Sequence, residues 1–386
     1  MTLEPPGPAD RLAAIRAPFL AAEAQLVDAP VIQPLGLLLD LAGEAMRARL
    51  FVVQGEGGEE ACLRPDFTIP LARIHMANDD AGAGRYIYEG KAFRVAPAGS
   101  GRAEEFLQIG LEAYGGGDKT AADAEVAALA WRAAEAGGRD DLSMILGDMA
   151  LFSAFVETLS LPTALAERLK RAVSRPAVLR AELDRAGEDA PTARQGDRFA
   201  ELLTGLPEAE ATAVLEDLWA LAGIQPVGGR RAGEIVHRLA QRAEAARAPG
   251  LSRAQADLVA RFLEVSGRPR AALAKAARIA REGGADIDAA LEAWSQRLAA
   301  LMAGGAPEDH LTLSTGFGRA FSYYDGFLFE VRSAALGAER PVAGGGRYDG
   351  LPLRLGGPDV GGAVGCMVRP ARAWAGLAAA DVEAPP

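Results

Sequence analysis

The pattern of apolar and polar positions divides the chain into a mixed first part, a helical middle and a strand-rich end. Apolar residues recur at helical spacing from Leu12 to Leu26 and again from Leu37 to Met46, and each run predicts a helix. Residues 50–54 predict a strand. Residues 142–149 are apolar enough for a further core strand, and the segment after them is predicted to be helical.

Two longer strands are predicted over residues 85–94 and 105–115, joined by a loop rich in small residues. Side chains alternate along a strand with period two, so Gln108 and Glu112 share one face. Asp66 precedes them in a turn. Polar groups that converge on a sheet surface can bind a small zwitterion, although an ordinary exposed strand face explains the same pattern.

The middle of the chain changes character between about residues 161 and 305. Ala, Arg, Leu and Glu dominate, and Gly or Pro separates segments of helix length. Apolar residues from Ile287 to Leu301 follow helical spacing, and Ser252 with Gln255 has the form of a capping box. These features predict an inserted helical domain, whose arginines we interpret as a solvated surface rather than a binding face.

Strand character returns at residues 311–317 and 327–331 and is followed by glycine-rich runs over 344–350 and 356–365. A phosphate-binding loop would need a following Gly-Lys-Ser/Thr or a strand–GxGxxG–helix context, and neither is present. The glycines are therefore predicted to form tight turns at the floor of a ligand site.

Composition limits the class of protein. The 386 residues carry a formal net charge of −11, which disfavours a partner gripped through many phosphates. Two cysteines and three scattered histidines provide neither a disulfide framework nor a metal site. No signal pattern or long apolar run is present. We expect a soluble, cytoplasmic protein without metal or cofactor.

Three stretches carry recognisable motifs. Residues 62–115 contain LRPDFT, FR and EFLQIGLEAYG, residues 319–330 read RAFSYYDGFLFE, and residues 344–351 read GGGRYDGL before a last segment, 361–369. In this order they resemble motif 2, the histidine-specific signature and motif 3 of class II aminoacyl-tRNA synthetases, specifically the histidyl enzymes. The resemblance implies an α+β fold, a mostly antiparallel sheet flanked by helices, with dimerisation through the N-terminal region near Pro34.

The same resemblance implies three segments: residues 1–160 and 306–386 form the two parts of the synthetase-like core, and 161–305 form the helical insertion. Histidyl synthetases carry an α/β anticodon-binding domain after motif 3. Only 17 residues follow Arg369 here, so that domain is expected to be missing.

The histidine half of the family's site is mostly retained. By resemblance, the ammonium group of the ligand would meet Asp66, Thr68 and Gln108, and its carboxylate would meet Arg319. Asp66 replaces the family's glutamate and reaches one methylene less far. Glu112 would bind one nitrogen of the imidazole, and a tyrosine would bind the other nitrogen. Together these two contacts would favour an imidazole over an apolar side chain.

Tyrosines complete this predicted histidine site. The resemblance places Tyr324 and Tyr348 around the imidazole and adds Tyr323, although core packing also explains Tyr323 and Tyr348. If the segment is extended, one of the neighbours Tyr323 and Tyr324 must point away from the site.

The ATP half departs from the family. Ala96 replaces a glutamate, Glu104 reverses the charge of an arginine and Val368 stands at the arginine of motif 3. Arg369 comes one residue later and, in an extended segment, is expected to face the other side. Two arginines, Arg94 and Arg102, remain as possible anion ligands. Adenylation as the family performs it is not expected.

A chain that keeps the amino-acid site without the adenylation groups is similar to the synthetase-like regulatory subunits of ATP phosphoribosyltransferase, the first enzyme of histidine biosynthesis. The resemblance implies no catalysis by the chain itself, activation of a short-form catalytic subunit, histidine feedback, and a homodimer within a hetero-octamer. Nucleic acid and membrane are not expected partners. Two alternatives stay open: an amino-acid ligase of synthetase type acting without tRNA, and an interaction protein with an empty relic pocket.

Overall fold

The computed structural model describes most of the chain: residues 3–5, 7–55, 58–78, 82–173, 176–187, 202, 205–221, 232–233, 236, 250–284, 286–318, 321 and 323–376. The chain forms two compact units. Unit 1 contains Met1–Ala154, Phe262–Arg281 and Asp286–Pro386, and unit 2 contains Phe155–Arg261 and Glu282–Ala285.

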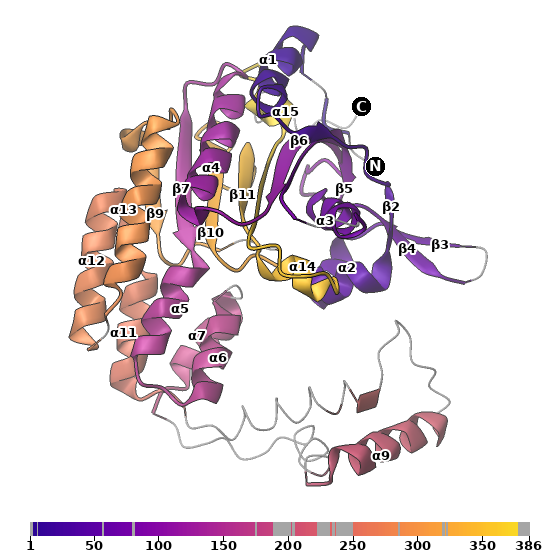
Figure 1. The fold of residues 1–386 in the computed structure, drawn as a ribbon, viewed down its shortest axis with the longest axis vertical. Helices are drawn as coiled ribbons and strands as arrows, with labels where there is room; N and C mark the ends of the chain where they lie inside the picture. Colours follow the sequence, from indigo (N-terminus) through magenta and orange to yellow (C-terminus); the bar gives the residue numbers. More distant parts are fainter. Residues whose placement is uncertain are drawn as a thin grey trace. The chain divides into compact units, whose positions relative to one another are not determined.

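Unit 1 is built on a mixed, mostly antiparallel sheet of nine described strands (Figure 1). Their order is β1-β5-β6-β12-β11-β10-β7-β9-β8, and β1–β5 and β7–β9 are the parallel pairs among them. The strands are β1 (Gln25–Leu26), β5 (Gly84–Phe93), β6 (Glu105–Tyr114), β7 (Leu142–Asp148), β8 (Ser266–Gly267), β9 (Leu311–Ser314), β10 (Phe327–Ser333), β11 (Ala343–Arg347) and β12 (Ala363–Val368). The predicted antiparallel sheet is confirmed.

The hairpin of β5 and β6 is the longest pairing of the sheet, and it follows the predicted alternation. Tyr86 lies opposite Glu112 and Gly90 lies opposite Gln108. Directly paired residues have their side chains on the same face, so Gln108 and Glu112 face the same side as the tyrosines of β5. β12 pairs with the other edge of β6 and brings Gly365 opposite Glu112.

The first glycine run forms a strand rather than the predicted turns. Gly344, Gly345 and Gly346 lie in β11, between β10 and β12. A Cβ at Gly345 would lie 2.1 Å from the carbonyl oxygen of Gly365, so the close approach of two strands requires glycine there. The prediction was wrong because close packing, and not only a turn, calls for glycine.

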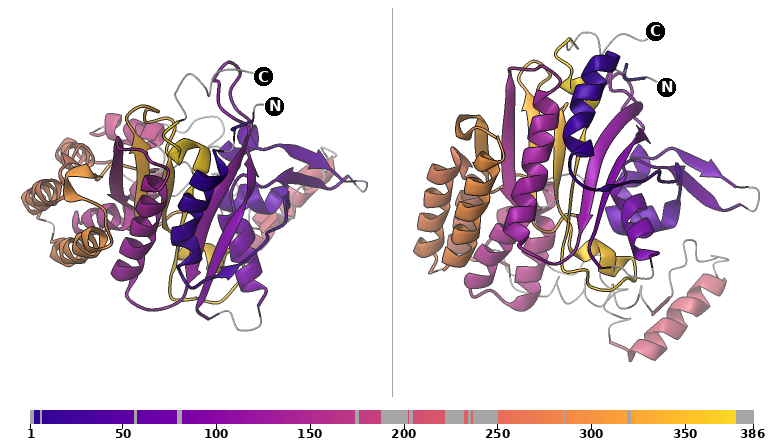
Figure 2. Two further views of the ribbon diagram at one scale, coloured as in Figure 1. Left: turned by 90° about the horizontal axis from the view of Figure 1, so that it is seen from above. Right: turned by 45° about the horizontal axis from the view of Figure 1, so that its top comes forward.

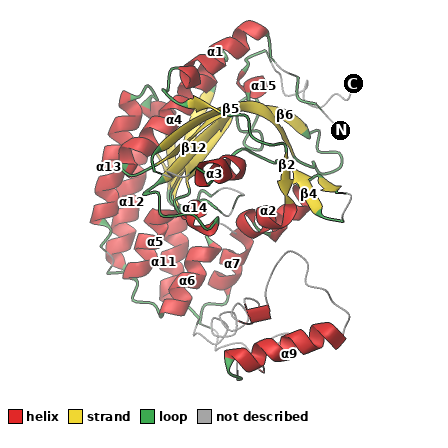
Figure 3. Ribbon diagram, turned by 45° about the vertical axis from the view of Figure 1, so that its right-hand side comes forward, coloured by secondary structure: helices red, strands yellow, loops and turns green. Residues whose placement is uncertain are grey.

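Helices cover both faces of this sheet (Figure 3). On one face α4 packs against β10, β11 and β12, with α13 and α1 packed against α4 (Figure 2). The other face is met by the start of α3, which packs against α14. The helices of unit 1, including two that unit 2 shares, are α1 (Ala9–Leu20), α2 (Leu35–Ala42), α3 (Thr68–Met76), α4 (Lys119–Glu135), α5 (Met149–Thr158), α12 (Pro269–Glu282), α13 (Asp288–Ala303), α14 (Gly350–Arg354) and α15 (Pro370–Ala373), with 3-10 turns η1 (Glu44–Arg49) and η2 (Glu308–His310).

The helix predictions are confirmed at α13 and corrected at α1. Trp294, Leu298 and Leu301 are buried on one face of α13. The predicted first helix ends at Leu20, because the chain turns at Glu23, whose φ is 46°, and Leu26 instead enters β1.

A small antiparallel sheet, β2-β4-β3, lies beside α2 in unit 1. Its strands are β2 (Ile32–Pro34), β3 (Val52–Gln54) and β4 (Glu60–Leu63). The predicted strand over residues 50–54 corresponds to β3. Ile32 is 60% exposed and Val52 is 42% exposed, so this sheet carries apolar side chains on the surface of the chain.

Unit 2 is helical in its described part. It contains α6 (Thr163–Ala172), α7 (Pro176–Asp184) and α9 (Glu208–Leu221), and most of α11 (Arg253–Leu263). The predicted capping box is confirmed: Ser252 N donates to Gln255 Oε1 at 3.0 Å, and Gln255 N donates to Ser252 Oγ at 3.2 Å. Residues 262–281 and 286–305 group with unit 1, whereas the predicted insertion over 161–305 includes them. No helix in the described residues is long and apolar enough to cross a membrane.

Candidate amino-acid pocket

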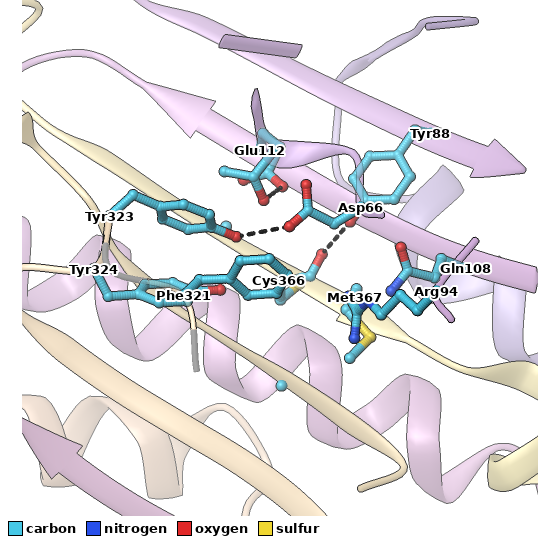
Figure 4. Close-up of a pocket in the computed structure, with 13 residues that line it drawn as sticks. Asp66, Tyr88, Arg94, Gln108, Glu112, Phe321, Tyr323, Tyr324, Cys366 and Met367 are labelled. Carbon is cyan, nitrogen blue, oxygen red and sulfur yellow. Dashed lines mark hydrogen bonds between the residues drawn. The ribbon is translucent and has the colours of Figure 1, made fainter. Parts of the chain in front are cut away.

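A polar pocket lies over β5, β6 and β12 on the face that the start of α3 covers (Figure 4). It holds about 300 Å³ of empty space, part of it open to solvent. Residues from far apart in the sequence line it: Asp66, Thr68, Tyr88, Arg94, Gln108, Glu112, Phe321, Tyr323, Tyr324, Gly344, Gly365, Cys366 and Met367.

Glu112 is the buried carboxyl group at the floor of the pocket. Thr68 Oγ1 donates to its Oε1 at 2.9 Å, and the hydroxyl of Tyr348 donates to its Oε2. Burial raises the pKa of Glu112 to about 8, although the bonds from Tyr348 and Thr68 oppose that rise. The carboxyl group is therefore held in place and is largely protonated at neutral pH.

Gln108 is completely buried, and neither its side-chain oxygen nor its nitrogen has a hydrogen-bond partner among the described residues. Such a group costs stability unless a ligand or water pairs with it. Asp66 lies nearby, and its Oδ2 accepts from the Tyr323 hydroxyl at 3.0 Å. Burial raises the pKa of Asp66 against the opposing charge of Arg94. The pocket thus presents polar atoms suited to a ligand that donates hydrogen bonds.

Arg94 is the guanidinium group of the described lining. Its Nε donates to the carbonyl oxygen of Pro65 at 2.8 Å, and the group lies 5.1 Å from the ring centroid of Phe321 and 5.3 Å from that of Phe106. These contacts place a fixed positive charge on the side of the pocket near Asp66.

The neighbours Tyr323 and Tyr324 both line the pocket, contrary to the prediction that one points away. They lie before β10, outside any strand, so their side chains need not alternate. Their ring centroids are 4.7 Å apart. Tyr348 is not part of the described lining, but its hydroxyl donates to Glu112 and so orients that carboxyl group.

The predicted anion ligands are separated. Arg94 lines the pocket, whereas Arg102 lies in the loop between β5 and β6 and donates to Glu339 at 2.5 Å. Arg319, the predicted carboxylate ligand, falls outside the described residues. Val368 is completely buried.

Arg369 corrects a further prediction. The residue continues β12 with extended dihedrals, so it shares the face of Gly365 and Met367, which line the pocket. Its guanidinium group lies 3.7 Å from the centroid of Phe106 and pairs with Glu4 at 2.7 Å. Arg369 therefore lies on the pocket side of the sheet, with its charge paired to the chain's own carboxylate.

Several lining residues were not predicted as ligands. Tyr88 donates to the carbonyl oxygen of Cys366 at 3.3 Å, and a Cβ at Gly110 would lie 2.2 Å from the Tyr88 hydroxyl. The period-two pattern of β5 and its pairing with β6 were sufficient to place Tyr88 on this face. Phe321, Cys366 and Met367 gave no such signal, because their position depends on contacts between distant segments.

The described lining provides carboxyl, amide and hydroxyl groups and one guanidinium group, and within it there is no histidine, lysine or serine. Buried acceptors beside one cation suit the binding of a small zwitterion with a polar side chain. Its two ends would meet opposite charges.

The family model for histidyl-tRNA synthetase matches residues 24–227 and 212–370. The chain is 34% identical over 347 residues to the ATP phosphoribosyltransferase regulatory subunit of Brucella anthropi, covering 89% of this chain and 90% of that protein. It is 36% identical to the same subunit of Chelativorans sp. over 347 residues, covering 88% and 89%.

Solved structures share the fold. An ATP phosphoribosyltransferase regulatory subunit/histidyl-tRNA synthetase from Bacillus halodurans superposes with a TM-score of 0.59 at 20% identity, covering 95% of this chain and 78% of that one. A histidine–tRNA ligase subunit from Alicyclobacillus acidocaldarius gives a TM-score of 0.55 at 20% identity, covering 95% and 92%. The synthetase-like fold that the motifs predict is confirmed.

Proposed function

Because the chain belongs to the family of ATP phosphoribosyltransferase regulatory subunits, we propose that it is a non-catalytic subunit of that enzyme in histidine biosynthesis. It activates a short-form catalytic subunit and makes that subunit sensitive to histidine. The ligand proposed for the pocket is therefore L-histidine.

The fully buried Gln108 carries the ligand proposal. Its amide has no hydrogen-bond partner among the described residues and belongs to a lining that also holds Asp66 and Glu112. An α-ammonium group would donate to the amide oxygen, an acceptor atom of the ligand would accept from the amide nitrogen, and Glu112 would bind one ring nitrogen of an imidazole. We propose Asp66, Thr68 and Gln108 for the ammonium group and Arg319 for the carboxylate, with Tyr323 and Tyr324 beside the ring and Tyr348 orienting Glu112.

The arginines near the pocket argue against adenylation. A triphosphate needs several cations aimed at its oxygens. Arg102 is paired with Glu339, Arg369 is paired with Glu4, and Val368 supplies no charge. This arrangement supports a binding role over the ligase alternative.

We propose that the subunit acts in the cytoplasm as a homodimer within a hetero-octamer, with residues 1–160 and 306–386 forming the core and 161–305 the insertion. The exposed apolar side chain of Ile32 supports an N-terminal dimer surface. Ile32 lies on the same face of the small sheet as Pro34, at the segment where the family dimerises, whereas Val52 lies on the opposite face.

The test is transferase activity. The short-form catalytic subunit of the same organism is assayed with and without this chain, and histidine is then titrated into the mixture. We expect activation by the chain and its reversal by histidine.

Failure of both activation and co-elution would refute the regulatory proposal. Histidine-dependent exchange between ATP and pyrophosphate then distinguishes the ligase alternative, which requires exchange by the chain alone.

A further inference from the structure

A buried ion network lies on the face of the sheet that α4 covers, opposite the pocket. Asp123 of α4 is completely buried, and Arg297 and Arg347 are each 7% exposed. Asp123 Oδ2 accepts from Arg297 Nε at 3.0 Å and from its Nη2 at 2.8 Å, and Asp123 Oδ1 accepts from Arg347 Nε at 2.8 Å. Buried charges are costly unless they are paired and hydrogen-bonded, and this carboxylate meets that condition for two arginines. The contacts proposed for the ligand use none of these groups.

Arg347 ends β11 with its side chain on the α4 face. Side chains alternate along a strand and Gly344 lines the pocket, so Arg347, three positions later, faces the other side. Each nitrogen of its guanidinium group donates a hydrogen bond: Nε to Asp123, Nη1 to Asp349 Oδ1 at 2.8 Å, and Nη2 to the carbonyl oxygen of Lys119 at 3.0 Å. The arginine is therefore fixed, and Asp123 is its fully buried acceptor.

The backbone connects this fixed arginine to Glu112. Tyr348 follows Arg347 directly, and its N–H donates to the carbonyl oxygen of Ala363 at 2.8 Å, which continues the pairing with β12. By alternation Tyr348 returns to the pocket face, where its hydroxyl donates to Glu112 Oε2. The position of Arg347 therefore determines where the Tyr348 hydroxyl meets the carboxyl group.

A second pocket segment is attached to the same arginine. Asp325 N donates to the carbonyl oxygen of Arg347 at 3.1 Å, and a Cβ at Gly326 would lie 3.0 Å from Arg347 Cδ. Asp325 directly follows Tyr323 and Tyr324, which line the pocket. The two segments that carry the pocket tyrosines thus meet at Arg347.

We infer that Asp123 is a positioning residue for the pocket: by holding Arg347 it fixes Tyr348 and, through the Tyr348 hydroxyl, orients the carboxyl group of Glu112 toward a ligand. Asp123 is not itself in the described lining, so it acts from the opposite face of the sheet. The inference rests on the proposed binding of histidine at this pocket.

The test is a double-mutant cycle of Asp123→Asn and Tyr348→Phe in the full chain, with the Kd for histidine measured by isothermal titration. Asparagine keeps the size of the side chain but turns an amide N–H₂ toward arginine donors. Tyr348→Phe is expected to weaken binding by about 10- to 100-fold, and Asp123→Asn by about 10-fold or more, because each loses the bond that orients Glu112. The double variant should bind within about twofold of the weaker single variant. Losses that multiply in the double variant would mean that Asp123 does not act through Tyr348, which overturns the inference.

Asp141→Asn is the matched control for loss of a buried ion pair. Asp141 accepts from Ser333 Oγ, which is bonded to the buried Arg139, away from the pocket tyrosines. This variant is expected to lower Tm but to leave the Kd for histidine within about twofold of the wild type. A loss of affinity as large as that of Asp123→Asn would trace both losses to destabilisation alone and would also overturn the inference.

Two further measurements keep the outcome decisive. If Asp123→Asn does not fold, Arg297→Lys replaces it in the same cycle, because it keeps the charge beside Asp123 but loses the planar fork. If the wild type does not bind histidine, the proposed ligand fails, and the cycle is read instead from free energies of unfolding in urea. Tyr348→Phe should then cost less in the Asp123→Asn background than in the wild type, whereas additive costs overturn the positioning role.

Discussion

At the scale of single residues, Glu112 is the group on which histidine recognition is expected to depend. Thr68 and Tyr348 hold its two oxygens, so its carboxyl group is oriented before a ligand arrives. We predict that Glu112→Gln weakens histidine binding by about 10- to 100-fold, the range for losing a hydrogen bond to a charged partner. Isothermal titration measures this directly. Glu125→Gln, at an exposed ion pair with Arg85, is the matched control and should bind as the wild type does.

The same residue predicts a pH dependence of stability. Burial raises the pKa of Glu112 to about 8 in the folded chain, well above the ordinary value of 4.5 that applies when it is unfolded. The folded state then binds more protons between these values, so the free energy of unfolding falls as pH rises from about 4.5 to about 8. Relative to Glu112→Gln, the wild type should lose about 1–4 kcal/mol over this window and nothing further above it.

Urea unfolding of the wild type and of Glu112→Gln from pH 5 to pH 9 measures the difference between their free energies of unfolding. A stability difference between the two that stays constant across the series would show that Glu112 ionises normally in the folded chain.

At the scale of elements, the contact between β6 and β12 fixes the position of the pocket floor. A Cβ at Gly365 would lie 1.6 Å from Glu112 Oε2. We predict that Gly365→Ala displaces the carboxyl group, abolishes measurable histidine binding and costs about 1–3 kcal/mol of stability, as overpacking does. Gly116→Ala, where an added Cβ meets nothing within 4 Å, is the control. Histidine binding by Gly365→Ala at wild-type strength would contradict this role of β12.

Local pattern was sufficient for the elements whose contacts are local. The β5–β6 hairpin, α13 and the capping box of Ser252 follow from spacing, and the structure confirms them. The glycines of β11 were wrongly predicted to form turns. Glycine is required there because β12, which lies far away in the sequence, approaches β11 closely. Leu26 matched a helix but pairs with β5. Sequence periodicity reports which face is apolar and does not report the partner strand.

The pocket shows the same division. Gln108, Glu112 and Asp66 were predicted from strand alternation and from the resemblance, and the structure brings them together. Tyr323 and Tyr324 both reach the pocket because their segment is not a strand, which their apolar surroundings in the sequence did not reveal. Arg369 reached the pocket face only through the continuation of β12 past Val368.

At the scale of the whole molecule, the proposed homodimer depends on an exposed apolar residue of the small sheet. Ile32 is 60% exposed although it is a large aliphatic residue. We predict that Ile32→Asp converts the dimer into a monomer, because a buried unpaired charge at an interface is costly. Light scattering after size-exclusion chromatography reports the mass. Val178→Asp, at an exposed position of α7, should leave the mass unchanged.

Feedback inhibition requires more of the assembly than binding of histidine in the pocket. Histidine can inhibit only if it binds one quaternary state better than another, and the effect is reciprocal. If histidine shifts the assembly between states, then assembly with the catalytic subunit must change the affinity of the chain for histidine by the same factor. We predict a ratio of about 5–150-fold, the range of ordinary allosteric coupling. Titration of histidine into the isolated chain and into the active complex measures the ratio, with Glu112→Gln in the complex as the control for binding elsewhere. Equal affinities in the two would mean that histidine binding at this pocket is not what inhibits the transferase.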